Sequence, residues 1–227
     1  MTDIRVKPSN KLIGGSGVTD FVPAKGMLDG TIFDAHWLQK MAFEGRMYTV
    51  HSGTGTAPNT FAGAYVNTTP DLDMSVPANQ CVVPISMTVN FETYGTSLLS
   101  EVVMAVGKGG VIAPTSATAA TPVNHRLDLG NNSGVTVVTD GTGATYMTSN
   151  VIEVYRNSSP MSITKTSASA TVSSIDPYRF EWSAIQSGIW PIMYATDGIT
   201  RLNIFACSNA GTGFITLTFV VPPLTLE

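Results

Sequence analysis

Hydrophobic and polar residues alternate with a period of two through much of the chain after residue 46, which is the pattern of half-buried β-strands. The run 83–91 places five apolar side chains on one face: Val83, Ile85, Met87, Val89 and Phe91. The run 102–106 is apolar without interruption, as in a strand that is covered on both sides. The pattern predicts a strand pair, 81–94 and 97–106, joined at Gly95-Thr96.

Other short strand-like runs follow one another at intervals of about ten residues, separated by Gly, Pro, Asn and Asp. They are 47–51, 60–66, 71–76, 151–155, 161–165, 170–175, 178–185, 190–195, 201–207 and 213–221. This spacing is typical of a sandwich or barrel, and the absence of a fixed repeat argues against propellers and solenoids. The sequence therefore predicts an all-β fold.

Two features precede the strands. Residues 1–30 contain Pro8, Pro23 and the flexible joint Gly14-Gly15-Ser16-Gly17, and they predict an extended N-terminal arm. Its apolar pairs (Leu12-Ile13, Phe21-Val22 and Met27-Leu28) are expected to contact a neighbouring copy. Residues 31–43 carry an apolar stripe of helical spacing and predict one short helix, ended by Gly45. We expect an arm over 1–30 and a single β-sandwich domain over 31–227.

Charge is scarce in this chain. Charged residues make up 12% of the sequence, against roughly 25% in an average protein. A surface with so little charge favours self-association, although Thr, Ser and Asn side chains could instead solvate it. The formal net charge is −4, and the first dozen residues hold three basic groups against one acidic group. We therefore expect no direct strong nucleic-acid binding.

The two cysteines and the hydrophobic runs bear on the compartment. Cys81 and Cys207 each lie in an apolar run, so we expect both to be buried and reduced. The first residues lack the apolar core of a signal peptide, and no run is long enough for a transmembrane segment. The expected place of synthesis is a soluble, reducing compartment.

Catalytic and metal-binding patterns are missing from the sequence. His36, His51 and His125 are isolated from one another, without a Cys or His at metal-ligand spacing. No Gly-x-Ser-x-Gly elbow follows a strand. We predict that the protein is not an enzyme and has no catalytic residue, no metal ligand and no cofactor.

Three groups of side chains have more than one interpretation. Asp71 and Asp73 share a strand face, and we expect an exposed acidic strand edge, with a subunit-bridging Ca²⁺ as the alternative. Glu92 and Glu101 would face each other across the predicted hairpin like a glycosidase pair, but no aromatic cluster stands beside them to stack a sugar. The aromatic residues, Trp37 among them, are expected in the core or an interface. The alternative is a sugar-stacking platform formed by Tyr178, Trp182 and Trp190.

Residues 76–85 and 98–106 look like the central hairpin of single jelly-roll virion proteins, and residues 213–223 resemble their last strand and tail. The likeness covers about 42–223, and it is to coat proteins of bacteriophages and to their tail-associated β domains. It implies a jelly-roll-type antiparallel β-sandwich, made in the host cytoplasm and located in the virion. Its partners would be copies of itself and other virion proteins. The arm lacks the dense basic charge of many RNA-virus coat proteins, which favours a DNA phage or a role away from the genome. The alternative function is a phage tail or fibre domain that binds a receptor or carbohydrate, with a host-surface glycan as partner.

Overall fold

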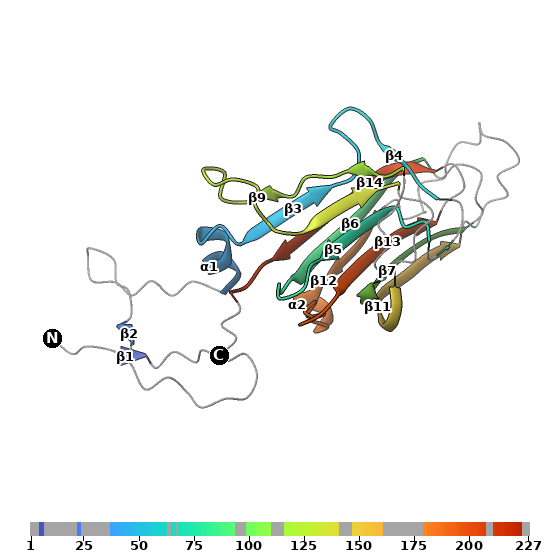
Figure 1. Cartoon of the computed structure of the whole chain (residues 1–227). Coiled ribbons are helices and arrows are strands. Elements are labelled where there is room, and N and C mark those ends of the chain that lie inside the picture. The colour runs from blue at the N-terminus through green and yellow to red at the C-terminus, as the bar shows by residue number, and fades with distance from the viewer. Residues whose placement is uncertain are drawn as a thin grey trace, which may run out of the picture.

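The computed structural model describes residues 5–6, 22–23, 37–62, 65–66, 68–93, 99–109, 116–140, 147–160, 179–207 and 211–223. Within these residues the protein is a sandwich of two antiparallel β-sheets (Figure 1). The expected all-β class is confirmed. Predicted strands at 161–165 and 170–175 lie outside the described residues.

Each sheet combines strands from distant parts of the chain. The first sheet has the order β12-β6-β14-β3-β9, with β4 paired to β14. Its members are β3 (Met47–His51), β4 (Asn59–Thr60), β6 (Val83–Thr93), β9 (Val123–Asn124), β12 (Arg179–Ser183) and β14 (Thr212–Val220). The second sheet has the order β11-β7-β13-β5-β10-β8. Its members are β5 (Leu72–Val76), β7 (Leu99–Gly109), β8 (Thr118–Ala119), β10 (Thr136–Thr139), β11 (Met147–Pro160) and β13 (Ile199–Cys207).

Eight of these strands follow jelly-roll topology. The row β12-β6-β14-β3 in one sheet faces the row β11-β7-β13-β5 in the other. Along the chain, β3, β5, β6 and β7 alternate between the two sheets, β11 stays beside β7, and β12, β13 and β14 alternate again. This is the two-sheet, Greek-key arrangement of a jelly roll. The predicted fold class is confirmed.

The predicted pairing of 81–94 with 97–106 is wrong. Strand β6 is hydrogen-bonded to β12 and β14, whereas β7 is hydrogen-bonded to β11 and β13 in the opposite sheet. The chain therefore crosses from one sheet to the other between these strands. Alternation shows which side chains share a face, but it does not identify the neighbouring strand.

The hydrophobic core lies between the sheets. It joins inward side chains of both, among them Leu72, Met104 and Ile204 from the second sheet and Val89 and Leu217 from the first. Burial alternates along β14, so the first sheet has one partly exposed face. In contrast, residues 102–107 of β7 and 200–207 of β13 are buried throughout, so the second sheet is covered on both faces at its centre.

Two helices flank the sheets. Helix α1 (Trp37–Phe43) falls within the predicted 31–43 segment, whose first six residues lie outside the described part. Helix α2 (Ala184–Ser187) is a single turn that the sequence did not predict. No helix in the described part of the chain is long and apolar enough to span a membrane.

Most of the predicted arm, residues 1–30, lies outside the described residues. Two short strands of it are described, β1 (Arg5–Val6) and β2 (Val22–Pro23), and they pair antiparallel. Figure 1 shows this pair apart from the sandwich, on the side of α1.

Both cysteines are buried and form no disulfide, as predicted. Burial, together with the nearby Asp71 and Glu101, raises the pKa of the Cys207 thiol to about 12. Burial also raises the pKa of the Cys81 thiol.

Candidate functional site

Asp71 and Asp73 do not form an exposed acidic edge. Strand β5 is hydrogen-bonded on both sides, to β10 and to β13, and both carboxylates are only 2% exposed. Asp73 accepts hydrogen bonds from Arg201 at 2.6 Å and from Asn203 at 2.8 Å. The prediction of a solvated strand edge is therefore wrong. The partners lie about 130 positions away in sequence, on the neighbouring strand β13.

Asp71 fastens a loop to the second sheet. One carboxylate oxygen accepts the backbone N–H of Ala62 at 2.7 Å, and the other accepts that of Ala206 at 2.6 Å. Burial raises the pKa of Asp71 to about 7, although these two hydrogen bonds lower it. Each carboxylate is thus engaged by protein donors. Across the described part of the chain, no three His, Cys, Asp or Glu side chains come together as a metal site.

Glu92 and Glu101 lie in opposite sheets, so they do not face each other across a hairpin. Glu101 is ion-paired to Arg156 on β11. His51 and His125 hydrogen-bond to the hydroxyl groups of Thr216 and Thr49, while His36 lies outside the described residues.

The predicted sugar-stacking platform is not assembled. Trp182 is buried in the core beneath β12, and Tyr178 lies outside the described residues. Trp190 instead packs against Trp37 of α1, with ring centroids 5.6 Å apart and planes inclined by 56°. Of the two predicted members that the structure describes, Trp190 lies at the surface and Trp182 does not.

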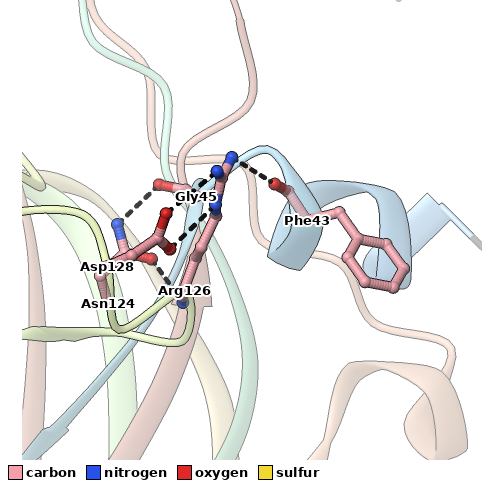
Figure 2. A network of polar contacts seen from close by, with 5 residues as sticks. All are labelled: Phe43, Gly45, Asn124, Arg126 and Asp128. Atoms are coloured by element: carbon pink, nitrogen blue, oxygen red, sulfur yellow. Dashed lines mark hydrogen bonds and ion pairs between the residues drawn. The ribbon is translucent and has the colours of Figure 1, made fainter.

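A network of polar contacts fixes the end of α1 (Figure 2). Arg126 donates to the carbonyl oxygen of Phe43 at 3.1 Å, where the helix leaves its last carbonyl groups free to accept. Asp128 holds the Arg126 guanidinium through two contacts of 3.0 and 3.1 Å. Asn124 donates to the carbonyl oxygen of Gly45 at 2.9 Å. Gly45, at φ +70°, supplies the left-handed residue that ends the helix.

The inner face of α1 packs on the edge of the core. Met41 is buried with Cys81, Ile85 and Val220, and Leu38 packs against the same cluster. This packing and the Arg126 network hold the helix in one orientation. In Figure 2 the Phe43 ring points away from Arg126.

An exposed apolar surface lies beside this fixed helix. Trp37, Ile189, Trp190 and Ile192, here called the Trp patch, are 39, 46, 39 and 52% exposed. Trp190 contacts Trp37, and the two isoleucines flank Trp190 in the loop after α2. Neighbouring apolar side chains left this open mark an interaction surface more often than isolated ones do. The sequence favoured Trp37 and Trp190 as core or interface residues, but it carried no signal for the isoleucines.

A hollow of about 470 Å³ with both polar and apolar lining residues lies elsewhere, between the loop after β3 and the ends of β8 and β10. Asn59 and Asp140 meet there at 2.9 Å, and burial raises the pKa of Asp140. Threonine hydroxyl groups and His51 complete the polar lining, and the described lining residues include no Lys or Arg. The hollow suits a small uncharged polar ligand better than a phosphate.

Comparison with known protein families, curated proteins and solved structures found no match to this chain. Function is therefore inferred from the protein's own fold, charge and surface.

Proposed function

We propose that this protein is a structural virion subunit, a capsid protein that assembles with copies of itself. The observation that carries the proposal is a jelly-roll sandwich that bears little charge and exposes the Trp patch at a fixed position. Jelly rolls occur in viral capsids, lectins and cupins, so the fold alone does not select a function. The surface supplies the further argument.

The outer face of the first sheet is rich in hydroxyl groups. Strands β3 and β14 contain no Asp, Glu, Lys or Arg. Thr49 and Thr218 bond to each other at 2.9 Å, and Thr93 and Thr212 at 3.0 Å. Removing such a face from water costs less than desolvating charged groups, and the paired hydroxyl groups keep their partners. A face of this kind can pack against another copy.

The buried polar groups support a structural role. Arg201 and Asn203 both donate to Asp73 beneath the surface, where a substrate would not meet them. The proposal includes no catalytic step and no cofactor. In it, the subunit is made in the host cytoplasm and resides in the virion. Genome packaging relies on confinement or on basic partner proteins, since the net charge of −4 opposes direct binding.

The test is the size and form of purified protein, measured by sedimentation velocity and negative-stain electron microscopy. Shells, sheets or closed rings are the expected result. A monomer at every accessible concentration would refute the proposal.

The second candidate is a tail or fibre domain that binds a host-surface glycan, and the hollow at Asp140 is the observation that favours it. Discrete trimers together with a glycan-array signal would support this function in place of assembly.

A further inference from the structure

The hollow beside Asp140 has fixed walls. The loop after β3 closes on itself through two backbone hydrogen bonds between Thr54 and Ala57, at 2.9 and 3.2 Å. A second wall is β8, which pairs with β10 so that Thr118 lies opposite Thr139. The volume of about 470 Å³ is within the range of small-molecule sites. A preformed site of this kind loses little conformational entropy on binding.

Two side chains that line the hollow have acceptor oxygens to spare. Nδ2 of Asn59 donates to Oδ1 of Asp140 at 2.9 Å, and the Asp140 carboxylate receives no other hydrogen bond from the described part of the chain. Burial raises the pKa of Asp140, although the hydrogen bond from Asn59 lowers it. The carbonyl oxygen of Asn59, a residue that is 8% exposed, likewise accepts from no described group. Both oxygens are therefore available to a ligand that donates hydrogen bonds.

The rest of the lining offers hydroxyl groups, a ring nitrogen and carbon surface. The hydroxyl groups of Thr54 and Thr121 can each donate and accept. Nδ1 of His51 lies 2.9 Å from the hydroxyl oxygen of Thr216, while Nε2 of the same ring has no partner in the described part of the chain. The apolar lining residues are Ala57, Pro58, Ala119 and Ala120. A matching ligand donates, accepts and also presents C–H groups.

Charge narrows the class of ligand. Among the described lining residues, Asp140 is the one Asp, Glu, Lys or Arg, so an anionic ligand would meet a carboxylate without a neighbouring cation. An ammonium ligand donates to the two free oxygens but has no acceptor for the threonine hydroxyl groups. The hydroxyl groups of a neutral sugar both donate and accept, and the C–H groups of its ring match the apolar residues.

We propose that the hollow beside Asp140 binds a neutral sugar, whose hydroxyl groups donate to the free oxygens of Asp140 and Asn59. Thr54, Thr121 and His51 contact the remaining hydroxyl groups of the sugar. The inference rests on the second candidate function, glycan binding, and adds to it the class of sugar and the residues that hold it. It does not depend on assembly, and a virion subunit can carry such a site.

The first experiment measures sugar binding to the full-length protein by saturation-transfer difference NMR, which serves free subunits and large assemblies alike. The probes are the methyl glycosides of glucose, galactose, mannose and N-acetylglucosamine. At least one of them should give a saturable signal with the unmodified protein. Asp140→Asn should weaken its binding about tenfold or more, as expected for loss of a charge-assisted hydrogen bond. Asparagine tolerates the φ of +57° at this position, so the variant should keep its fold.

The matched control is Asp197→Asn, which removes the same charge from an aspartate whose side chain is 88% exposed. Asp197 precedes β13, whereas Thr139 lies level with Ile204, toward the other end of that strand, through their shared partner Leu72. The control should bind the sugar like the unmodified protein. Thermal melts should show that the variants are folded.

A second variant, Ala119→Phe, tests the hollow without any change of charge. Ala119 is an exposed residue of β8 that lines the hollow, so the larger side chain should occupy the space of the ligand and weaken binding. Loss of binding in both Ala119→Phe and Asp140→Asn, with binding retained in Asp197→Asn, supports the proposed site.

Charged probes test the class of ligand. Glucuronic acid keeps the ring hydroxyl groups of glucose and adds a carboxylate, while butylamine carries an ammonium group and no hydroxyl group. Both should bind more weakly than the best neutral glycoside. If either binds more tightly than every neutral glycoside, the inference is overturned.

The outcomes separate this inference from both candidate functions. A neutral sugar that binds the unmodified protein, Asp140→Asn and Ala119→Phe equally well overturns the inference, while glycan binding stands as a function with its site elsewhere. No signal from any neutral glycoside also overturns the inference. Assembly is measured separately by sedimentation, so shells that bind none of these sugars leave the virion proposal standing.

Discussion

Removing the carboxylate of Asp73 should be one of the most damaging single changes to this fold. Asp73 and Arg201 are each 2% exposed and are joined at 2.6 Å. Asn203 donates to the same carboxylate at 2.8 Å, and Ser75 contacts it at 3.3 Å. Asp73→Ala leaves the guanidinium buried without this carboxylate. Breaking one half of a buried ion pair typically costs about 3–5 kcal/mol.

The assay is equilibrium unfolding in urea, with the free energy of unfolding extrapolated to water. The matched control is Glu153→Ala, which removes an ion pair to Arg156 between partners that are each more than 40% exposed. Exposed pairs contribute less than about 1 kcal/mol, so the control should remain close to the unmodified protein. The double variant Asp73→Leu with Arg201→Met replaces the pair with apolar groups and should recover most of the stability that Asp73→Ala loses.

The reasoning would be refuted if Asp73→Ala cost no more than Glu153→Ala. The pair would then be solvated in solution, and β5 would not be the covered central strand that its hydrogen bonds to β10 and β13 indicate.

Three further predictions concern groups in or near the second sheet. Because the pKa of Asp71 is raised from 3.8 to about 7, the folded protein holds this proton more tightly than the unfolded chain. The contribution of Asp71 to the free energy of unfolding should therefore be full below about pH 4 and fall by about 1.4 kcal/mol per pH unit as the pH rises to about 7. If the Asp71 carboxyl carbon titrates near pH 3.8 by NMR, this prediction is wrong. Gly109→Ala should destabilise the protein by about 1–3 kcal/mol in thermal or urea unfolding. A Cβ at this position would lie 2.6–2.7 Å from Cγ, Cδ and Nε of Arg201, whose side chain is held by its hydrogen bond to Asp73. An unchanged unfolding midpoint would show that the Arg201 side chain can move. In a Cys81→Ser background, Cys207 should react far more slowly with a thiol reagent in native buffer than in urea, since a pKa of about 12 leaves roughly one thiolate in ten thousand at pH 8; complete labelling on mixing would exclude the buried position.

Local pattern was enough to predict which side chains enter the core. The five alternating residues of 83–91 are all buried, and the uninterrupted run 102–106 is buried on both faces of its sheet. Both predictions depend only on a residue's neighbours one or two positions away, because side chains alternate across a strand. The pairing of β6 with β7 depended on more than that. A loop that crosses between sheets and a tight hairpin can join the same two strands, so the partners of each strand are set by the whole topology.

The polar cluster was missed for a related reason. Asp73 alternates with Leu72 and Met74 as an exposed strand residue would, and the sequence around it does not show that a basic partner will cover it. Arg201 and Asn203 alternate with Leu202 and Ile204 in the same way. In the sheet the two strands lie side by side, with Asn203 opposite Asp73. Each segment alone has the pattern of a half-exposed strand, but in the sheet their opposite charges meet and are buried. The alternation therefore predicts correctly which side chains share a face, and it predicts wrongly that this face is exposed to water.

The tryptophans show where an apolar sequence context stops being informative. Trp182 alternates with Arg179 and Glu181 on β12, and the charged residues mark the outer face, so the tryptophan must point into the core. Trp190 stands between Ile189 and Pro191 without any polar residue to mark a face. Its loop could have been buried on all sides, yet the structure leaves Ile189, Trp190 and Ile192 substantially exposed. Exposing an apolar run of this kind to water is unfavourable, and the free-energy cost is removed when a partner covers the run.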